Sequence, residues 1–239
     1  MKLNRVGVDL AKNVFQLHGV ERHGKAVWKR RLKRGQWLKA LLDQVEPGCE
    51  IGMEACGGAH HWARELQSRG YTVKLIPPQF VKPYVKSNKN DANDAEAICE
   101  AMSRPNMRFV TVKSVAQQDI QATHRIRTEL KDQRNAKANQ IRGLVAEYGL
   151  VAPLTLRALR VAIPEWLEDA DNGLTDHFRS LLHGVWLDLV SLDDRVVELD
   201  RDIARLANSN EVTRRLQQLR GVGPMVATAL VATVGDAGP

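Results

Sequence analysis

The sequence predicts an α/β domain with a mixed sheet, then a region of long helices, then the start of a helical C-terminal domain. Two observations lead to this fold class. Strand-like and helix-like segments alternate through the first hundred residues, which is typical of α/β sheets. Beyond Pro105 the strand pattern stops and helical periodicity takes over. We expect domains at residues 1–113, 114–208 and 209–239.

The chain opens with short β-rich stretches separated by Lys, Asn, His and Gly, which favour turns. They span residues 3–12, 13–22 and 24–33. Residues 35–45 then place apolar side chains at helical spacing, up to Pro47-Gly48. Three leading hairpin strands before the first helix make the expected sheet mixed.

The alternation continues with a buried-type strand at 49–55 and a helix at 59–70 that Gly70 ends. Another strand, 71–78, stops at Pro77-Pro78, and after a loop a helix covers 90–102. The predicted order is therefore β-β-β-α-β-α-β, a loop, and α.

The helical region begins with residues 115–149, which lack proline and predict one long helix. A loop carrying Pro153 and Pro164 follows. Next comes a heptad pattern that predicts a coiled coil. Its members are Leu182, Val185, Leu189, Leu192, Val196, Leu199, Ile203 and Leu206. We expect this seam to join the chain to a second copy as a homo-oligomer; the alternative is an antiparallel pairing with the 115–149 helix.

The last stretch, 216–236, predicts a helix, a Gly-x-Gly-Pro turn and a second apolar helix. Backbone amides near Gly221 and Gly223 are candidates to bind a phosphate at the second helix's N-terminus. A plain helical turn is the alternative.

The composition is that of a soluble globular protein, with 44% hydrophobic and 26% charged residues. No apolar run approaches the length needed to cross a bilayer, and the N-terminus lacks a signal-peptide pattern. The thiols Cys49, Cys56 and Cys99 show no CxxC spacing and fit a reducing compartment. We expect a cytoplasmic protein with no membrane partner.

The net charge of +7 is distributed unevenly: +9 over 1–113, +4 over 114–160, −7 over 161–206 and +1 over 207–239. Clustered Lys and Arg favour nucleic-acid binding because phosphate contacts release counterions. A basic surface that only aids solubility is the alternative. The candidate phosphate-binding side chains are Lys12, Lys86, Lys89, Arg125, Arg134 and Lys137.

Four carboxylates stand at the ends of predicted core elements. Asp9 ends the first strand and Glu54 ends the fourth, while Asp91 and Asp94 start a helix and share one of its faces. If the first and fourth strands are neighbours, Asp9 and Glu54 lie side by side. Clustered carboxylates repel one another, and a divalent cation removes that cost. Hard carboxylate oxygens suit Mg²⁺ or Mn²⁺, so the pattern indicates a metal-dependent phosphoryl-transfer site.

Each acid also has an ordinary role on its own, such as a turn, a cap or a partner of the helix dipole. His60 and His61 are poor joint ligands because adjacent helical side chains diverge. The sequence contains no P-loop, GxSxG, HExxH or paired CxxC motif, so those chemistries have no support.

Several stretches resemble the DEDD transposases of a bacterial insertion-sequence family guided by a bridge RNA. They are GVDLAKNVFQLHGV, GMEACGGAHHWARELQSRGYTVKLIPPQFVKPY, KNDANDAEAI and LRGVGPMVATALVATVGD. The resemblance implies a ribonuclease-H-like domain of the Holliday-junction-resolvase type and a coiled-coil middle. It implies Mg²⁺ held by Asp9, Glu54, Asp91 and Asp94, with DNA and guide RNA as partners.

The family also implies a nucleophilic serine downstream of the Gly-x-Gly-Pro turn. All serines of this sequence lie upstream of it: Ser68, Ser87, Ser103, Ser114, Ser180, Ser191 and Ser209. We therefore expect a fragment or a truncated member. The main function expected is a DNA recombinase. The alternatives are a junction-resolving nuclease, a non-catalytic nucleic-acid-binding oligomer and, least supported, a sugar-kinase-like ATPase.

Overall fold

The computed structural model describes residues 3–85 and 91–234, and the side chains of residues 91 and 92 lie outside that description. The chain divides into two compact units, Met1–Ser114 and Val115–Pro239. The predicted α/β class followed by long helices is confirmed. The finer division at residue 208 stays a prediction.

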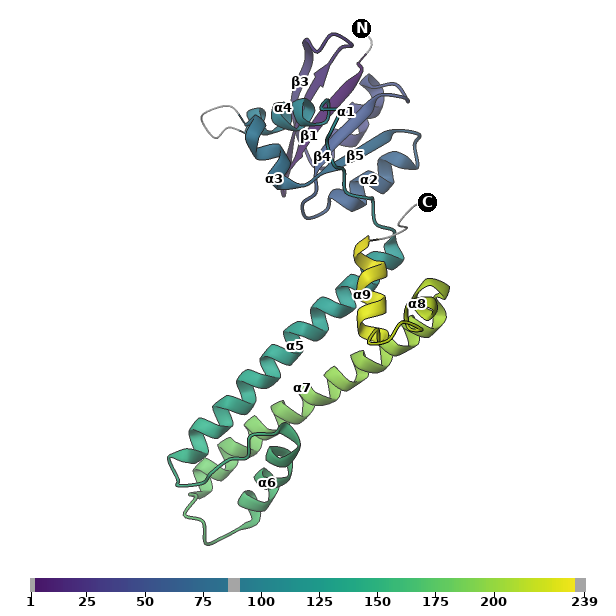
Figure 1. Ribbon diagram of the computed structural model, residues 1–239. Helices are drawn as coiled ribbons and strands as arrows, with labels where there is room; N and C mark the ends of the chain where they lie inside the picture. Colours follow the sequence, from purple (N-terminus) through teal and green to yellow (C-terminus); the bar gives the residue numbers. More distant parts are fainter. Residues whose placement is uncertain (1–2, 86–90, 235–239) are drawn as a thin grey trace. The chain divides into compact units, whose positions relative to one another are not determined.

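The first unit is built on a five-stranded mixed sheet in the order β3-β2-β1-β4-β5 (Figure 1). Its strands are β1 (Arg5–Leu10), β2 (Val14–Val20), β3 (Ala26–Lys33), β4 (Glu50–Glu54) and β5 (Thr72–Ile76). The first three strands pair antiparallel as hairpins, whereas β1 pairs parallel with β4 and β4 with β5. The first and fourth strands are therefore neighbours, as the site hypothesis requires.

Helices cover both faces of this sheet. On one face, α1 (Trp37–Gln44) and α2 (Ala59–Gln67) share a core with the inward side chains Val6, Val8 and Met53. On the other face lies α4 (Asp91–Ala101), which contacts β1, β2 and β4. Between β5 and α4 the chain forms two short turns of helix, α3 (Pro78–Val81) and η1 (Lys82–Tyr84), where the sequence predicted a loop. The result is a three-layer α/β sandwich.

Over residues 115–234, the second unit consists of two long antiparallel helices and three shorter ones (Figure 1). The long pair is α5 (Val115–Ala146) and α7 (Asp176–Ser209). The shorter helices are α6 (Leu156–Glu168), α8 (Glu211–Leu216) and α9 (Pro224–Val234). α9 packs against both long helices, and α6 packs against α7.

The heptad seam of α7 is used within the chain. Leu182, Leu189, Val196 and Ile203, every second member of the pattern, are at most 2% exposed. The N-terminal pair of these shares a cluster with Ile141 and Val145 of α5. The intramolecular pairing is thus the one observed, and an oligomer through the seam stays a prediction.

The loop predicted around Pro153 and Pro164 was partly wrong, because residues 156–168 form α6. Thr155 caps this helix by accepting a hydrogen bond from the Ala158 amide. Leu159 and Ile163 are fully buried, one turn apart, in the cluster with α7. This burial outweighs the helix-breaking tendency of Pro164, which lies inside the helix.

Candidate metal centre and nucleic-acid interface

The acids Asp9 and Glu54 stand at the same edge of the sheet. In the parallel pairing of β1 with β4, Val8 is opposite Met53, so the next step along both strands brings Asp9 beside Glu54. Both side chains are half-buried. Because strand side chains alternate, Asp9 shares its face with Gly7, and Glu54 shares its face with Gly52.

That face is the one against which α4 packs. A Cβ on Gly7 would lie 2.7 Å from the amide nitrogen of Cys99, and a Cβ on Gly52 would lie 2.6 Å from the sulfur of Met102. At Gly7 the short distance is to the backbone of α4, so only glycine allows the helix to approach β1 this closely. At Gly52 the short distance is to the flexible end of the Met102 side chain, just after α4. Gly7 therefore fixes the height of α4 above β1.

The direction of α4 brings its first turn to the acidic edge. Cys99, near the C-terminal end of α4, lies by Gly7. Burial raises the pKa of the Cys99 thiol, and the charge of Arg5, at the start of β1, opposes this rise, so Cys99 also lies near Arg5. The helix therefore runs opposite to β1, and its N-terminal acids lie toward Asp9 and Glu54. Asp94 is half-buried there, and Asp91 is the first residue of the helix.

The electrostatics record the proximity of these carboxylates. Burial, and secondly the charge of Asp94, raise the pKa of Glu54. Burial, and then the charges of Glu54 and Asp9, raise the pKa of the half-buried Cys56 thiol. Three of the four predicted acids, Asp9, Glu54 and Asp94, thus lie close enough to the ends of β1 and β4 for their charges to raise the pKa of groups there.

The acids of this edge do not close into a complete ligand set among the described residues. No three His, Cys, Asp or Glu side chains there are arranged as a group that could hold a metal ion. The side chain of Asp91, the fourth predicted ligand, is outside the described part of the chain. The donor type nevertheless fits Mg²⁺ or Mn²⁺, which prefer carboxylate oxygens.

Lysines were predicted as phosphate contacts near this edge. Lys12 is exposed in the turn between β1 and β2, three residues after Asp9. This turn follows the carboxyl end of β1, so Lys12 belongs to the acidic edge. Lys86 and Lys89 lie outside the described residues.

Two of the predicted phosphate contacts on α5 are already paired with acids of α7. Arg134 bonds Asp193 at 2.7 Å, and Lys137 lies 3.2 Å from Asp188. Burial would raise the pKa of Asp193, but hydrogen bonds from Arg134 and Arg160 outweigh it and lower that pKa. Arg134, whose side chain is 15% exposed, is thus engaged with an acid of α7. Binding of nucleic acid by Arg134 stays a prediction. Lys137 is similarly engaged, although it is more exposed.

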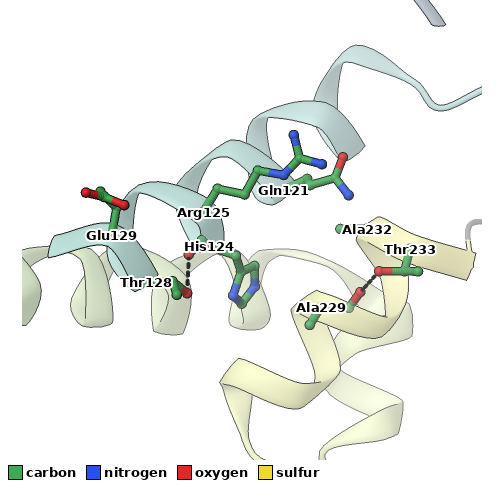
Figure 2. Close-up of a pocket in the computed structure, with 8 residues that line it drawn as sticks. All are labelled: Gln121, His124, Arg125, Thr128, Glu129, Ala229, Ala232 and Thr233. Atoms are coloured by element: carbon green, nitrogen blue, oxygen red, sulfur yellow. Dashed lines mark hydrogen bonds between the residues drawn. The ribbon is translucent and has the colours of Figure 1, made fainter. Parts of the chain in front are cut away.

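Arg125, by contrast, is exposed and lines a cavity of about 360 Å³ between α5 and α9. Figure 2 shows this cavity with Gln121, His124, Arg125, Thr128, Glu129, Ala229, Ala232 and Thr233. His124 meets the buried Thr228 hydroxyl at 2.9 Å, and Gln117 donates to the Val231 carbonyl, so polar contacts fix α9 on α5.

The Gly-x-Gly-Pro turn has the geometry that its residues suggest. Gly221 adopts a φ of +88°, the left-handed conformation that favours glycine, and α9 begins at Pro224. Binding of a phosphate by Gly221 and Gly223 stays a prediction.

His60 has a structural role that the sequence reasoning missed. Its Nδ1 accepts a hydrogen bond from the Lys113 amide at 3.1 Å, and Arg64 donates to the Lys113 carbonyl at 2.6 Å. Burial, then the charges of Lys113 and Arg64, lower the pKa of His60. Helix α2 thereby holds the last residues of the first unit. No sequence signal joined residues 60 and 113.

Comparisons with known proteins agree with this architecture. Residues 6–150 match the family of IS110-type DEDD transposases, whose description is "Transposase". A probable family 20 transposase of Pseudomonas aeruginosa is 47% identical over 99% of this chain and 70% of its own length. The transposase of insertion sequence element IS1111A from Coxiella burnetii is 43% identical over 97% of this chain and 63% of its own length. The transposase of IS1328 from Yersinia enterocolitica is 37% identical, over 97% of this chain and 68% of its own length.

Proposed function

The chain belongs to the IS110-type DEDD transposase family, and from that premise we propose that its first unit binds Mg²⁺ or Mn²⁺ and cleaves DNA strands during recombination. The proposed ligands are Asp9, Glu54, Asp91 and Asp94. This chain spans 63–70% of the length of the three relatives described above, so the complete recombination reaction is a proposal for the longer protein.

The observation that carries the proposal is the meeting of acids from three separate elements. Asp9 and Glu54 are adjacent on parallel strands, and α4 brings Asp94 close enough for its charge to raise the pKa of Glu54. Such repulsion is costly in a folded protein unless a ligand compensates for it. A divalent cation is the ligand that suits four carboxylates.

A metal bound there would supply Lewis-acid stabilisation of charge at a phosphodiester. The residues of the chain supply the remainder. The carboxylates hold and orient the ion, and Lys12 on the neighbouring turn binds a phosphate of the strand. The +9 charge of residues 1–113 attracts the DNA backbone toward this edge.

A guide RNA and a second copy of the chain are the further partners proposed. The resemblance to bridge-RNA-guided transposases and the basic first unit support the RNA. Exposed apolar side chains on the long helices, Ile126 at 51% and Leu187 at 49%, support self-association. Sedimentation of the purified chain tests the oligomer: a monomer at all concentrations contradicts it.

Cleavage of a labelled branched DNA tests the proposed chemistry. We expect Mg²⁺-dependent cleavage that Asp9→Asn and Asp94→Asn abolish, whereas Asp43→Asn, an exposed acid on α1, leaves it unchanged. Parallel assays with the full-length Pseudomonas relative separate two reactions. A covalent protein–DNA adduct indicates recombination, whereas free 5′-phosphate ends without an adduct indicate a junction-resolving nuclease. Cleavage that persists in both acidic-site variants contradicts the site.

A further inference from the structure

A second cavity of the first unit combines aromatic rings with arginines. Its volume is about 400 Å³, within the range of small-ligand sites. It lies between the short helices that follow β5 and the loop that follows α4. Its lining residues are Phe80, Pro83, Tyr84, Arg104, Asn106, Met107 and Arg108.

The floor of this cavity is apolar and firmly supported. Phe80, Tyr84 and Met107 are half-buried and pack on a fully buried cluster that includes Ile76 of β5 and Ile98 of α4. Each of the three side chains therefore has one side in the core and another toward the cavity. The rings are held in place before any ligand arrives, so little conformational entropy is lost on binding.

The rim is positively charged. The Arg104 guanidinium lies 5.3 Å from the centroid of the Tyr84 ring, and it also pairs with Glu100. Arg108 is exposed, and no ion pair with it occurs in the described part of the chain. The lining residues that the structure describes include no carboxylate. An anionic ligand with a flat apolar part is the chemistry that this lining fits.

We propose that this cavity binds an unpaired nucleobase of a single strand. The base stacks on the pair formed by the Tyr84 ring and the Arg104 guanidinium that lies over it, and Arg108 binds the adjoining phosphate. Aromatic rings and arginine planes are the usual partners of unstacked bases. Asn106 supplies an amide that can bond to the base edge. The cavity in Figure 2, by comparison, has no aromatic ring except His124 among its described lining residues.

The position of the cavity relates it to the acids, and this step rests on the proposed function. Both sites lie along α4, with Asp94 in its first turn and the cavity beyond its end at Ala101. At 1.5 Å per residue, the separation from Asp94 to Ala101 is about 10 Å along the helix axis.

Equilibrium binding of short single strands tests the proposal. The probes are a fluorescent DNA strand, the RNA strand of the same sequence, and an abasic strand of equal length and charge. We expect the strand with bases to bind about tenfold more tightly than the abasic strand, the order of one stacked base. Tyr84→Leu should remove that difference. Phe109→Leu, which removes a 40%-exposed ring outside the cavity, should preserve it.

Charge variants separate the two halves of the site. Arg108→Gln should weaken binding of strands with and without bases by a similar factor and lower the salt dependence. Lys25→Gln, an exposed residue of the β2–β3 turn, is the matched control. The preference between DNA and RNA identifies which strand occupies the cavity.

Photo-crosslinking of a 5-iodouracil strand to the unmodified protein gives a readout that needs no variant. Crosslinks within residues 80–84 or 104–108 support the proposal. Crosslinks confined to other residues overturn it, as does equal binding of abasic and normal strands by the wild-type protein. Binding that does not depend on the bases, together with metal-dependent cleavage, contradicts the nucleobase site and leaves the proposed function intact. Binding that depends on the bases, without metal-dependent cleavage, contradicts the proposed catalytic function and leaves the nucleobase site intact.

Discussion

Gly7 sets the position of the acidic helix through the side chain that it lacks, and Gly52 is its counterpart on β4. Each lies two residues before a carboxylate on its strand, Asp9 or Glu54, and on the same face. The backbone of α4 rests directly on Gly7, and the Ile98 side chain of α4 lies against Gly52, so the spacing that seats the helix also seats its acids. A small residue here is thus part of the site without binding anything.

Substitution of Gly7 by alanine tests this dependence. The new methyl group would collide with the α4 backbone at Cys99, and overpacking of this kind costs about 1–3 kcal/mol of unfolding free energy. We expect that loss in urea denaturation, together with weaker Mn²⁺ binding. Gly35→Ala has open space and is the control. A Gly7→Ala protein as stable as the control would show that α4 is not seated in this way.

At the scale of elements, α2 holds the end of the first unit through a neutral histidine. The His60 Nδ1 accepts a hydrogen bond from the Lys113 amide, which a protonated imidazolium nitrogen cannot do. Its pKa is lowered, so the folded protein disfavours the charged form. The stabilisation is fully present above the unfolded pKa of about 6.5 and is lost as pH falls through the lower folded pKa.

Amide exchange measures this contact. We expect the Lys113 amide to be protected at neutral pH and to exchange faster as pH falls through the lowered pKa of His60, after correction for intrinsic rates. His60→Ala should remove the protection at every pH, whereas His61→Ala, an exposed neighbour, should retain it. Protection that is independent of pH and of His60 would contradict the assignment.

The long helices are joined by charge as well as by their apolar seam. Asp193 of α7 receives hydrogen bonds from Arg134 and Arg160 and is 18% exposed at its side chain. Asp193→Asn should destabilise the second unit by about 1–3 kcal/mol, because it weakens bonds to charged donors and leaves Arg134 poorly paired. Asp194→Asn, at a side chain 66% exposed, should change stability by less than about 0.5 kcal/mol. Thermal unfolding of both variants decides; equal melting temperatures would refute the pairing's importance.

Some of these elements could be predicted and others could not. Asp9 and Glu54 were expected side by side on the condition that the first and fourth strands are neighbours, and the sheet meets that condition. The helical spacing of α7 followed from its apolar repeat. The partner of that repeat did not follow, because periodicity shows a buried face without showing what covers it. The same limit applies to Arg134, whose acid lies 59 residues away along the chain. Gly7 and Gly52 carried a signal, the GVD and GME patterns, but its meaning required the position of α4.

At the scale of the whole molecule, charge divides the chain by role. Residues 161–206 carry a net charge of −7. Three of their acids, Asp188, Asp193 and Asp200, form ion pairs with basic side chains of α5, so much of the positive charge of α5 is compensated within the chain. The +9 charge belongs to residues 1–113, the part of the chain that also holds the acidic edge and the aromatic cavity. No helix in the described ranges is long and apolar enough to cross a membrane. Because the first unit carries the larger positive charge, we locate the main contact with nucleic acid there.

The central claim is that carboxylates from β1, β4 and α4 bind one divalent metal site. Mn²⁺ binding, followed by electron paramagnetic resonance of the free ion, measures it most directly. The account predicts saturable binding to the wild-type chain, at least tenfold weaker binding by each of Asp9→Asn, Glu54→Gln and Asp94→Asn, and wild-type binding by Asp43→Asn. Unchanged Mn²⁺ binding in the three site variants would contradict it.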